Sequence, residues 1–332
     1  YIDQALNVVY PADVRQDGPL DVFMAHMDVV FSDETELPLR VEDGRIYCPG
    51  VGDDTACLVC LLMAGKYIAR HVDSPRWRGI RGEDAPGLLL VCNAGEEGLG
   101  NLKGARKICE DYGGRIKSFC TFDSSLSSIV DRAVGSKRFR VKVRTRGGHS
   151  YNDFGNDNAI AGLASLVGNL YKIQVPEGGK TTYNVGMISG GTSVNTIAQE
   201  AGMLYEFRSD KRENLEYMER QFTEVLDRAK AEGMDVSFQV IGVRPCEGQV
   251  DPAQKQALTD WAHRVVEEMT GQAPKHHAGS TDCNIPLSLG IPSVCVGSFR
   301  GAGAHTREEY VETDSLEEGY KVAFGMIFGR RD

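Results

Sequence analysis

Carboxylate and imidazole side chains recur in short motifs that each follow an expected strand. His26-Met27-Asp28 ends the apolar run Leu20–His26, and Asn93-Ala94-Gly95-Glu96-Glu97-Gly98 follows Leu88–Asn93. Two adjacent glutamates at the mouth of a buried strand suit a site in which one ligates a metal and the other moves protons. A His-x-Asp pair alone favours a structural histidine, although the carboxylate could instead orient a metal-ligating imidazole.

Three further positions carry the same side-chain types. Gly52-Asp53-Asp54 opens an expected helix, where an N-cap followed by a first-turn acid is the alternative interpretation. Asp123 ends the strand-like run Ile116–Asp123, and His305 lies in a Gly-rich loop. Each is structural if taken alone. Together, two imidazoles and several carboxylates suit Zn²⁺, Co²⁺ or Mn²⁺. A pair of metals about 3.5–4 Å apart needs a bridging carboxylate, which Asp53 could supply.

The elements that must position these residues alternate between strand and helix. Short apolar runs at 20–26, 88–93 and 116–123 read as strands, and the nearly all-apolar segment Asp54–Arg70 reads as a buried helix. Such alternation predicts an α/β fold with a mostly parallel sheet. Ligands in open α/β sheets bind beyond the carboxyl ends of the strands, where the motifs lie.

The middle of the chain has a different pattern. Lys137–Arg146 alternates polar and apolar residues, as in a sheet with one wet face. The expected order over this part is β-α-β-β-α-β, which matches the ferredoxin-like motif; its elements are Lys137–Arg146, Ala159–Ile173, Thr182–Ile188, Glu200–Arg208, Asn214–Glu232 and Val236–Val243. A helix at Pro252–Gly271 and a strand at Ser293–Gly297 resume the α/β pattern. We therefore predict a catalytic domain of residues 1–134 and 248–332, interrupted by a ferredoxin-like domain at 135–247.

Composition excludes several classes of protein. The net charge of −10 disfavours nucleic acid and anionic membranes as partners, and no apolar run is long enough to span a membrane. The nine cysteines are odd in number, and Cys57 and Cys60 lie three apart on an apolar helix, which favours buried thiols over disulfides or a redox pair. No signal peptide is recognisable, so we expect a cytoplasmic protein; because the chain begins at Tyr1, this expectation covers only the residues present.

In this order, the motifs resemble those of a family of di-zinc hydrolases that includes peptidase T, glutamate carboxypeptidase, aminoacylase, and the acetylornithine and succinyl-diaminopimelate deacylases. The matching segments cover nearly the whole chain: AHMD, GVGDD, NAGEEGLG, TFDSS, GGHSYNDFGNDNAI, GGTSVNTIAQEAGMLYEFRSD, GSTDCNIPLSLGIPSV and GAHTREEY. One departure is Thr55, where many members have lysine. The resemblance implies a metal-binding α/β domain with an inserted ferredoxin-like lid through which two subunits form a homodimer.

The resemblance also implies a ligand set for two Zn²⁺ ions per subunit, with Co²⁺ or Mn²⁺ as alternatives. His26 and Asp123 would bind one metal, and Glu97 and His305 would bind the other. Asp53 would bridge both ions. In this family the peptide bond after the bridging aspartate is often cis, which makes Asp53–Asp54 a candidate for a cis bond.

Further roles follow from the same resemblance. Glu96 would be the general base, taking a proton from the bridging water and passing it to the leaving amine, while Asp28 would orient His26. The expected substrate contacts are His149, which would serve the partner subunit's active site as an oxyanion donor, and Asn195, Arg208 and the Gly279-Ser280-Thr281 segment. Arg208 could hold a substrate carboxylate through two hydrogen bonds, or be an ordinary strand-face arginine.

The predicted activity is hydrolysis of an amide bond in a small peptide, as in a di- or tripeptidase, aminopeptidase or other exopeptidase. An N-acyl-amino-acid deacylase of the acetylornithine or succinyl-diaminopimelate type is the alternative, because the same metal centre serves either substrate. From another class, a metal-dependent binding protein without catalysis remains open, as does a hydrolase with a single metal. Glu96→Ala should separate catalysis from metal binding.

Overall fold

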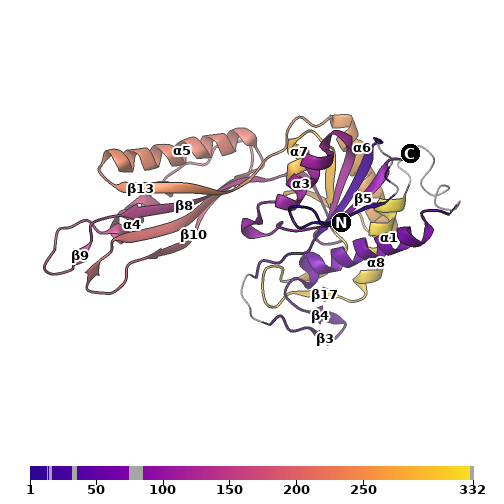
Figure 1. Cartoon of the computed structure of the whole chain (residues 1–332), viewed down its shortest axis with the longest axis horizontal. Coiled ribbons are helices and arrows are strands. Elements are labelled where there is room, and N and C mark those ends of the chain that lie inside the picture. The colour runs from indigo at the N-terminus through magenta and orange to yellow at the C-terminus, as the bar shows by residue number, and fades with distance from the viewer. Residues whose placement is uncertain (13, 15–16, 32–35, 75–84, 330–332) are drawn as a thin grey trace. The chain divides into compact units, whose positions relative to one another are not determined.

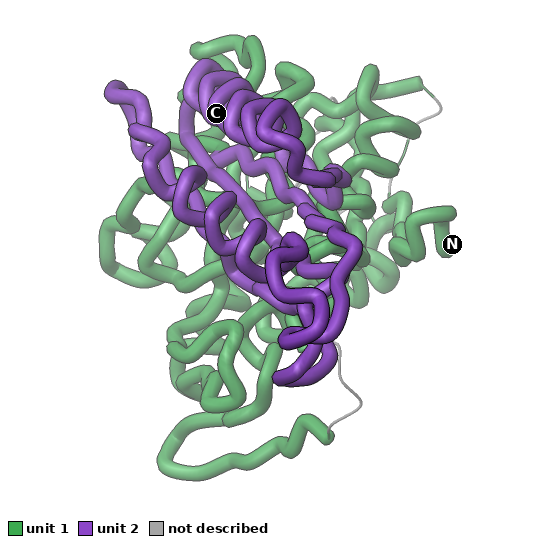
Figure 2. The backbone as a smooth tube through the Cα atoms, turned by 90° about the vertical axis from the view of Figure 1, so that its left-hand side faces the viewer, with its two compact units in different colours: residues 1–133, 247–332 green, residues 134–246 purple. Residues whose placement is uncertain are grey.

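The computed structural model describes residues 1–12, 14, 17–31, 36–74 and 85–329. Within them, the chain forms two compact units. Unit 1 comprises Tyr1–Ala133 and Glu247–Asp332, and unit 2 comprises Val134–Cys246 (Figure 2). In the described ranges, no helix combines the length and the apolar character that crossing a bilayer requires.

Unit 1 is built on a seven-stranded sheet, in the order β1-β5-β2-β6-β15-β7-β14 (Figure 1). Four neighbouring pairs are parallel, and the pairs β1–β5 and β15–β7 are antiparallel, so the predicted mostly parallel α/β sheet is confirmed. The strands are β1 (Val8–Ala12), β5 (Gly87–Asn93), β2 (Leu20–His26), β6 (Ile116–Phe122), β15 (Ser293–Val296), β7 (Ser128–Ala133) and β14 (Lys275–Gly279).

Helices cover both faces of this sheet. As a result, every residue of the central strands β2 and β5 is buried. On one face pack α1 (Cys57–His71), α6 (Pro252–Thr270) and α8 (Ser315–Phe328). On the other pack α3 (Lys103–Tyr112) and α7 (Asn284–Ser288). Alternate residues of β2 serve the two cores, since successive side chains of a strand point to opposite faces.

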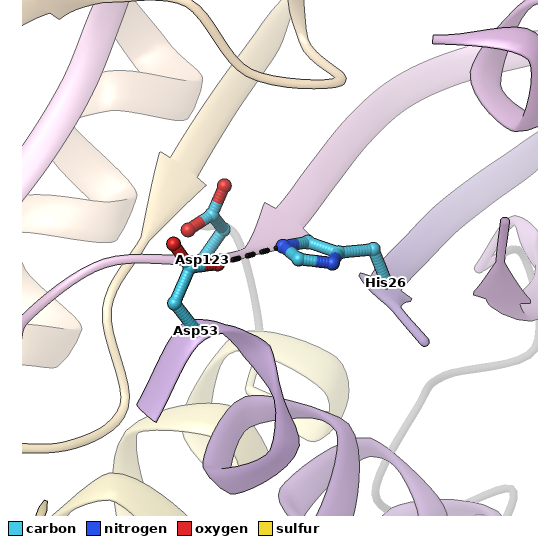
Figure 3. Close-up of side chains that lie close together, drawn as sticks. All are labelled: His26, Asp53 and Asp123. Atoms are coloured by element: carbon cyan, nitrogen blue, oxygen red, sulfur yellow. Dashed lines mark hydrogen bonds and ion pairs between the residues drawn. The ribbon is translucent and has the colours of Figure 1, made fainter. Parts of the chain in front are cut away.

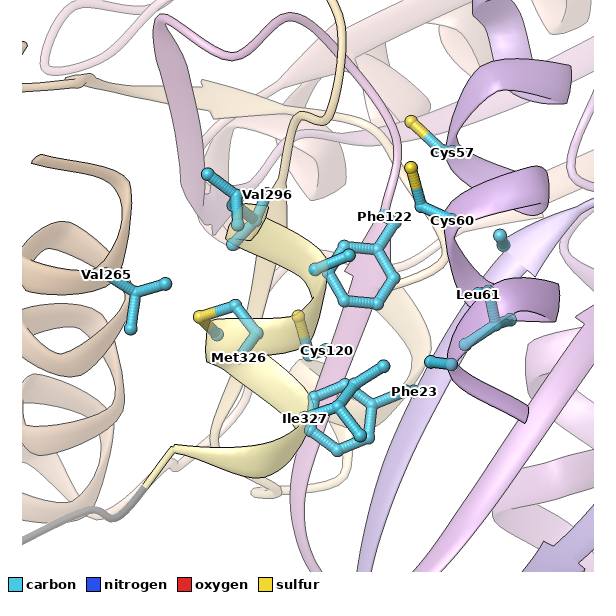
Figure 4. Packing of buried hydrophobic residues seen from close by; sticks show 14 of the residues in the cluster. Phe23, Cys57, Cys60, Leu61, Cys120, Phe122, Val265, Val296, Met326 and Ile327 are labelled. Carbon is cyan, nitrogen blue, oxygen red and sulfur yellow. The ribbon is translucent and has the colours of Figure 1, made fainter. Parts of the chain in front are cut away.

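The core on the α1 side lies directly beneath the strand ends that carry the polar motifs. The rings of Phe23 and Phe122 stack with centroids 6.0 Å apart, and Leu61 from α1 and Ile327 from α8 belong to the same cluster (Figure 4). Cys57 and Cys60 are buried free thiols of this core, as the sequence predicts. This packing supports the ends of β2 and β6 from within the protein, because core side chains are closely packed and resist displacement.

A small antiparallel sheet, in the order β16-β17-β4-β3, brings two distant segments of unit 1 together. Its strands are β16 (Gly301–Ala302), β17 (Tyr310–Glu312), β4 (Arg45–Tyr47) and β3 (Arg40–Glu42). Tyr310 pairs with Tyr47 and Val311 pairs with Ile46. The segment that leads into Asp53 therefore lies beside the segment that contains His305.

Unit 2 has the ferredoxin-like order of elements that the sequence predicts. The four antiparallel strands are arranged β10-β12-β8-β13, and α4 and α5 pack on the same hydrophobic core as the sheet. The elements in chain order are β8 (Gly135–Arg144), α4 (Ala159–Leu170), β10 (Thr181–Gly190), β12 (Glu200–Ser209), α5 (Arg212–Ala231) and β13 (Asp235–Arg244). A two-stranded ladder of β9 (Gly148–His149) and β11 (Thr196–Ile197) adjoins them.

The predicted helix Asp54–Arg70 begins later than expected. A π-helical turn spans Val51–Ala56, α1 starts at Cys57, and Asp53 and Asp54 have non-helical φ/ψ values. The helix start was wrong because tertiary hydrogen bonds hold this segment: the Asp53 N–H donates to Glu309, and the Asp54 carboxylate accepts from the N–H of His26. Neither aspartate caps the helix as the alternative interpretation supposed.

Candidate metal centre

Three adjacent parallel strands deliver carboxylates and an imidazole to one edge of the sheet of unit 1. His26 is the last residue of β2, which pairs with β5 on one side and β6 on the other. Glu96 and Glu97 follow β5, and Asp123 directly follows β6. Because parallel strands end at the same edge, these four residues converge although they are far apart in the chain.

Asp53 lies between the two histidines. Its Oδ1 atom is 2.9 Å from Nε2 of His26, and its Oδ2 atom is 3.0 Å from Nε2 of His305. The same His305 nitrogen is 3.1 Å from Oε1 of Glu97. Figure 3 shows His26 facing Asp53, with Asp123 on the adjoining strand end. The Asp53–Asp54 peptide bond is cis, as predicted.

Potential ligand atoms form overlapping groups within 4.8 Å of one another. One group joins His26, Asp53 and Asp123, and a second joins Asp53, Glu97 and His305. A third joins His26 with Glu96 and Glu97. All five residues predicted as ligands therefore meet in one place, and Asp53 is common to the two groups that the resemblance assigns to separate metals.

The electrostatics of this cluster fit bound cations. Burial raises the pKa of Asp123 well above its usual range. Burial, together with the charges of Asp53 and Glu96, raises the pKa of Glu97 to about 7. For Asp53, burial is outweighed by the hydrogen bond and charge of His26 and by the charge of His305, so its pKa is lowered. Several partly buried carboxylates thus share two imidazoles, an excess of negative charge that divalent cations would neutralise.

His26 is oriented differently from expectation. The prediction gave the Asp28 side chain this task, but Nδ1 of His26 lies 2.9 Å from the Asp28 backbone carbonyl and 3.9 Å from its carboxylate. The backbone carbonyl fixes the tautomer that leaves Nε2 available toward Asp53. Burial would lower the pKa of His26, but the carboxylates of Asp54 and Asp53 outweigh it and raise that pKa.

The Asp28 carboxylate instead holds the loop after β5. Its Oδ1 accepts the N–H groups of Gly95 at 2.8 Å and Glu96 at 3.2 Å, and its Oδ2 accepts the N–H of Glu97 at 2.9 Å. An ionised carboxylate has about four lone-pair sites, so the two oxygens of Asp28 can accept all three of these N–H groups at once. Asp28 therefore positions both adjacent glutamates.

Glu309 is a residue that sequence reasoning missed. It is 2% exposed, and its carboxylate accepts hydrogen bonds from the turn that precedes Asp53. The only signal in the sequence was its place four residues after His305, and its neighbour Glu308 is an exposed glutamate of the same type. Burial, which separates the two, depends on the fold.

The predicted substrate contacts are distributed over both units. His149, Asn195 and Arg208 belong to unit 2, and Ser280 lies in unit 1 after β14. His149 is exposed, and its Nδ1 accepts the N–H of Tyr151 at 3.2 Å. Asn195 lies on the neighbouring loop, where its carbonyl accepts the N–H of Ser150.

Arg208 is already engaged within unit 2. Its Nε donates to Oε1 of Glu206 at 2.9 Å, and one terminal nitrogen donates to Oε2 of the same residue at 3.2 Å. To bind a substrate carboxylate through two hydrogen bonds, the Arg208 guanidinium would have to give up at least part of its hydrogen bonding to Glu206.

A mostly parallel α/β sheet with overlapping carboxylate and imidazole groups at its carboxyl edge, interrupted by a ferredoxin-like unit, defines a metallohydrolase. Residues 22–328 match the model of peptidase family M20/M25/M40. The chain belongs to this family, which confirms the resemblance, and it is a metallopeptidase-type hydrolase of amide bonds.

Curated relatives are similar over most of their length. The chain is 26% identical over 290 residues to an acetylornithine deacetylase of Myxococcus xanthus, with 84% of this chain and 71% of the relative covered. It is 25% identical over 323 residues to a succinyl-diaminopimelate desuccinylase of Nitrosomonas eutropha, with 91% and 80% covered.

Solved structures share the fold. A tripeptidase from Staphylococcus aureus superposes with a TM-score of 0.74 at 22% identity, covering 98% of this chain and 87% of that one. The aminopeptidase PepT of Bacillus cereus has a TM-score of 0.68 at 22% identity, covering 97% and 83%. A Bacillus subtilis protein described as a dinuclear metal binding peptidase has a TM-score of 0.59 at 18% identity, covering 97% and 85%.

Proposed function

We propose that this chain is an exopeptidase that hydrolyses di- or tripeptides with two zinc ions per subunit. The observation that carries the proposal is the Asp53 carboxylate between His26 and His305, with a further carboxylate, Asp123 or Glu97, completing the ligand group on each side. Such a shared carboxylate is what a pair of cations requires. The donor set consists of imidazole and carboxylate groups and contains no thiolate. Such a set suits zinc, with cobalt or manganese as substitutes.

Glu96 is the proposed general base. It is 6% exposed and lies with His26 and Glu97 in one of the ligand groups. Bound divalent cations would polarise the scissile carbonyl and acidify the attacking water. The Glu96 carboxylate accepts the proton of that water and donates it to the leaving amine, and the hydrogen bond from its N–H to Asp28 keeps it in place. His26 and Asp53 act as ligands and take no proton from the substrate.

Contacts to the substrate are proposed for four residues. Asn195 and Arg208 would bind its polar end, and Ser280 would line the pocket. His149 would donate a hydrogen bond to the developing oxyanion in a second copy of the chain, so we also propose a homodimer assembled through unit 2. The exposure of His149 supports this role, because its ring is free of the cores of its own unit.

Cysteine chemistry supports a cytoplasmic location for this enzyme. All nine cysteines are free, and eight of them are buried. Free thiols in this number are typical of a reducing compartment.

A deacylase of N-acyl amino acids is the second candidate, because the curated relatives with 25–26% identity carry deacetylase and desuccinylase names. The solved structures named as a tripeptidase and an aminopeptidase favour the peptide. Both reactions break a secondary amide, so the metal cluster alone does not discriminate between them.

The deciding experiment combines metal analysis with a substrate panel. We expect two equivalents of zinc per chain and turnover of di- and tripeptides, with N-acetyl and N-succinyl amino acids as the competing substrates. Faster hydrolysis of an N-acyl amino acid would favour the deacylase. One metal equivalent in replete buffer would favour a single-metal hydrolase, and two equivalents without turnover of any amide would favour a binding protein.

A further inference from the structure

Glu309 is a buried carboxylate directed at the backbone rather than at the metal ligands' side chains. It directly precedes β17 and is 2% exposed. Its Oε2 accepts the N–H of Gly50 at 2.6 Å, and its Oε1 accepts the N–H groups of Gly52 at 2.9 Å and Asp53 at 2.7 Å. A buried charge is tolerated when convergent donors of this kind satisfy it.

The turn is shaped to present these three donors together. Gly50 has φ 77°, a left-handed conformation that favours glycine. A Cβ atom on Gly52 would lie 2.6 Å from the Phe299 ring and 3.0 Å from Oε1 of Glu309. The turn therefore has no space for a larger residue at Gly52, and its N–H groups point at one carboxylate.

Glu309 also ties the two halves of the metal cluster together. His305, four residues earlier, contacts the Asp53 carboxylate through Nε2 at 3.0 Å. The Glu309 backbone carbonyl accepts the N–H of Cys48 at 3.1 Å, which extends the β17–β4 ladder by one pair. One segment thus contacts Asp53 twice, at its side chain through His305 and at its backbone through Glu309.

We propose that Glu309 is a positioning residue that sets where the Asp53 carboxylate lies between His26 and His305. Glu309 acts through the backbone N–H of Asp53, and both of its carboxylate oxygens accept backbone N–H groups. Without the negative charge, the three N–H groups would lack a common acceptor, and the turn would release Asp53 from its place between the imidazoles. The inference rests on the metal role proposed for Asp53.

The test is Glu309→Gln, which keeps the size of the side chain but places an amide N–H₂ against backbone donors. The metal-free protein is titrated with Zn²⁺ against a chromophoric chelator. We expect the affinity for the cation pair to fall about 10–100-fold, the usual effect of removing a residue that orients a ligand. At saturating Zn²⁺ we expect KM to stay unchanged, because Glu309 is buried and its carboxylate is engaged by backbone N–H groups.

Glu308→Gln is the matched control, since it removes the same charge from the exposed neighbouring residue. It should bind Zn²⁺ like the wild type. Glu309→Asp keeps the charge but shortens the side chain by one methylene. If Glu309→Gln does not fold, this variant tests the positioning role instead, and a lowered Zn²⁺ affinity supports that role.

Wild-type affinity for both cations in every folded Glu309 variant would overturn the inference while leaving the proposed function intact. Failure of the wild type to bind a pair of cations would instead overturn the proposed function, and this inference with it.

Discussion

The His26 ring donates to the backbone of Asp28 rather than to its side chain, with Nδ1 2.9 Å from the carbonyl oxygen and 3.9 Å from the carboxylate. The side chain is thereby left to hold the loop that carries Glu96 and Glu97. Asp28 thus orients the His26 ring through its backbone carbonyl and the two glutamates through its side chain. A side-chain substitution at Asp28 should affect only the second.

Asp28→Asn is therefore expected to lower kcat by about 10–100-fold, because an amide can accept from two of the three N–H groups but not from all. Metal content should stay near that of the wild type, since His26 keeps its backbone partner. Steady-state kinetics and metal analysis on the same preparation check this. Asp73→Asn, in an exposed turn, is the control. Loss of metal with unaltered kcat in the reloaded protein would contradict the assignment.

Glu96→Ala is expected to retain both cations and to lose turnover by about 10²–10⁴-fold, the usual contribution of a general base. The reason is that the proposed ligands His26, Asp53 and Glu97 remain. Glu110→Ala, which removes a glutamate that is 74% exposed, should leave activity unchanged. Substantial hydrolysis by a metal-replete Glu96→Ala protein would remove Glu96 from the role of base.

Removal of metal should abolish hydrolysis and lower stability together. Without cations, the carboxylates of Asp53, Glu97 and Asp123 repel one another at partial burial, and bound metal stabilises only the folded state. A free cation concentration of 100 times Kd should add about 2.7 kcal/mol to the free energy of unfolding. Thermal unfolding of chelated and zinc-reloaded protein measures this, and equal melting temperatures would argue against metal binding at this cluster.

The affinity for metal should depend on pH. Burial raises the pKa of Asp123, and burial with the charges of Asp53 and Glu96 brings that of Glu97 to about 7. A cation binds the deprotonated carboxylate, so below this pKa it must displace a proton. We therefore expect apparent affinity to decrease as the pH is lowered through about 7. Calorimetry in two buffers of different ionisation enthalpy measures the protons released; a release of none would contradict the expectation.

Much of this protein can be read from short segments. The runs at Leu20–His26 and Leu88–Asn93 are mostly apolar, which marks strands buried on both faces, and histidine or carboxylate residues of the types that bind metals end or follow each run. The alternation in Lys137–Arg146 identified a sheet with one covered face. These patterns depend only on neighbours in the chain, so the type and order of the elements agree with the structure, whereas the start of α1, which tertiary hydrogen bonds set, does not.

What the sequence determined by itself was therefore the type and order of elements and the set of side chains able to hold a pair of metals. The tertiary structure decided which atoms meet: the carbonyl of Asp28 rather than its carboxylate on His26, and Glu309 on the turn before Asp53. Every residue has a backbone carbonyl, and Glu308 and Glu309 are chemically identical. Only burial and the pairing of β17 with β4, which joins residues more than 250 positions apart, distinguish them.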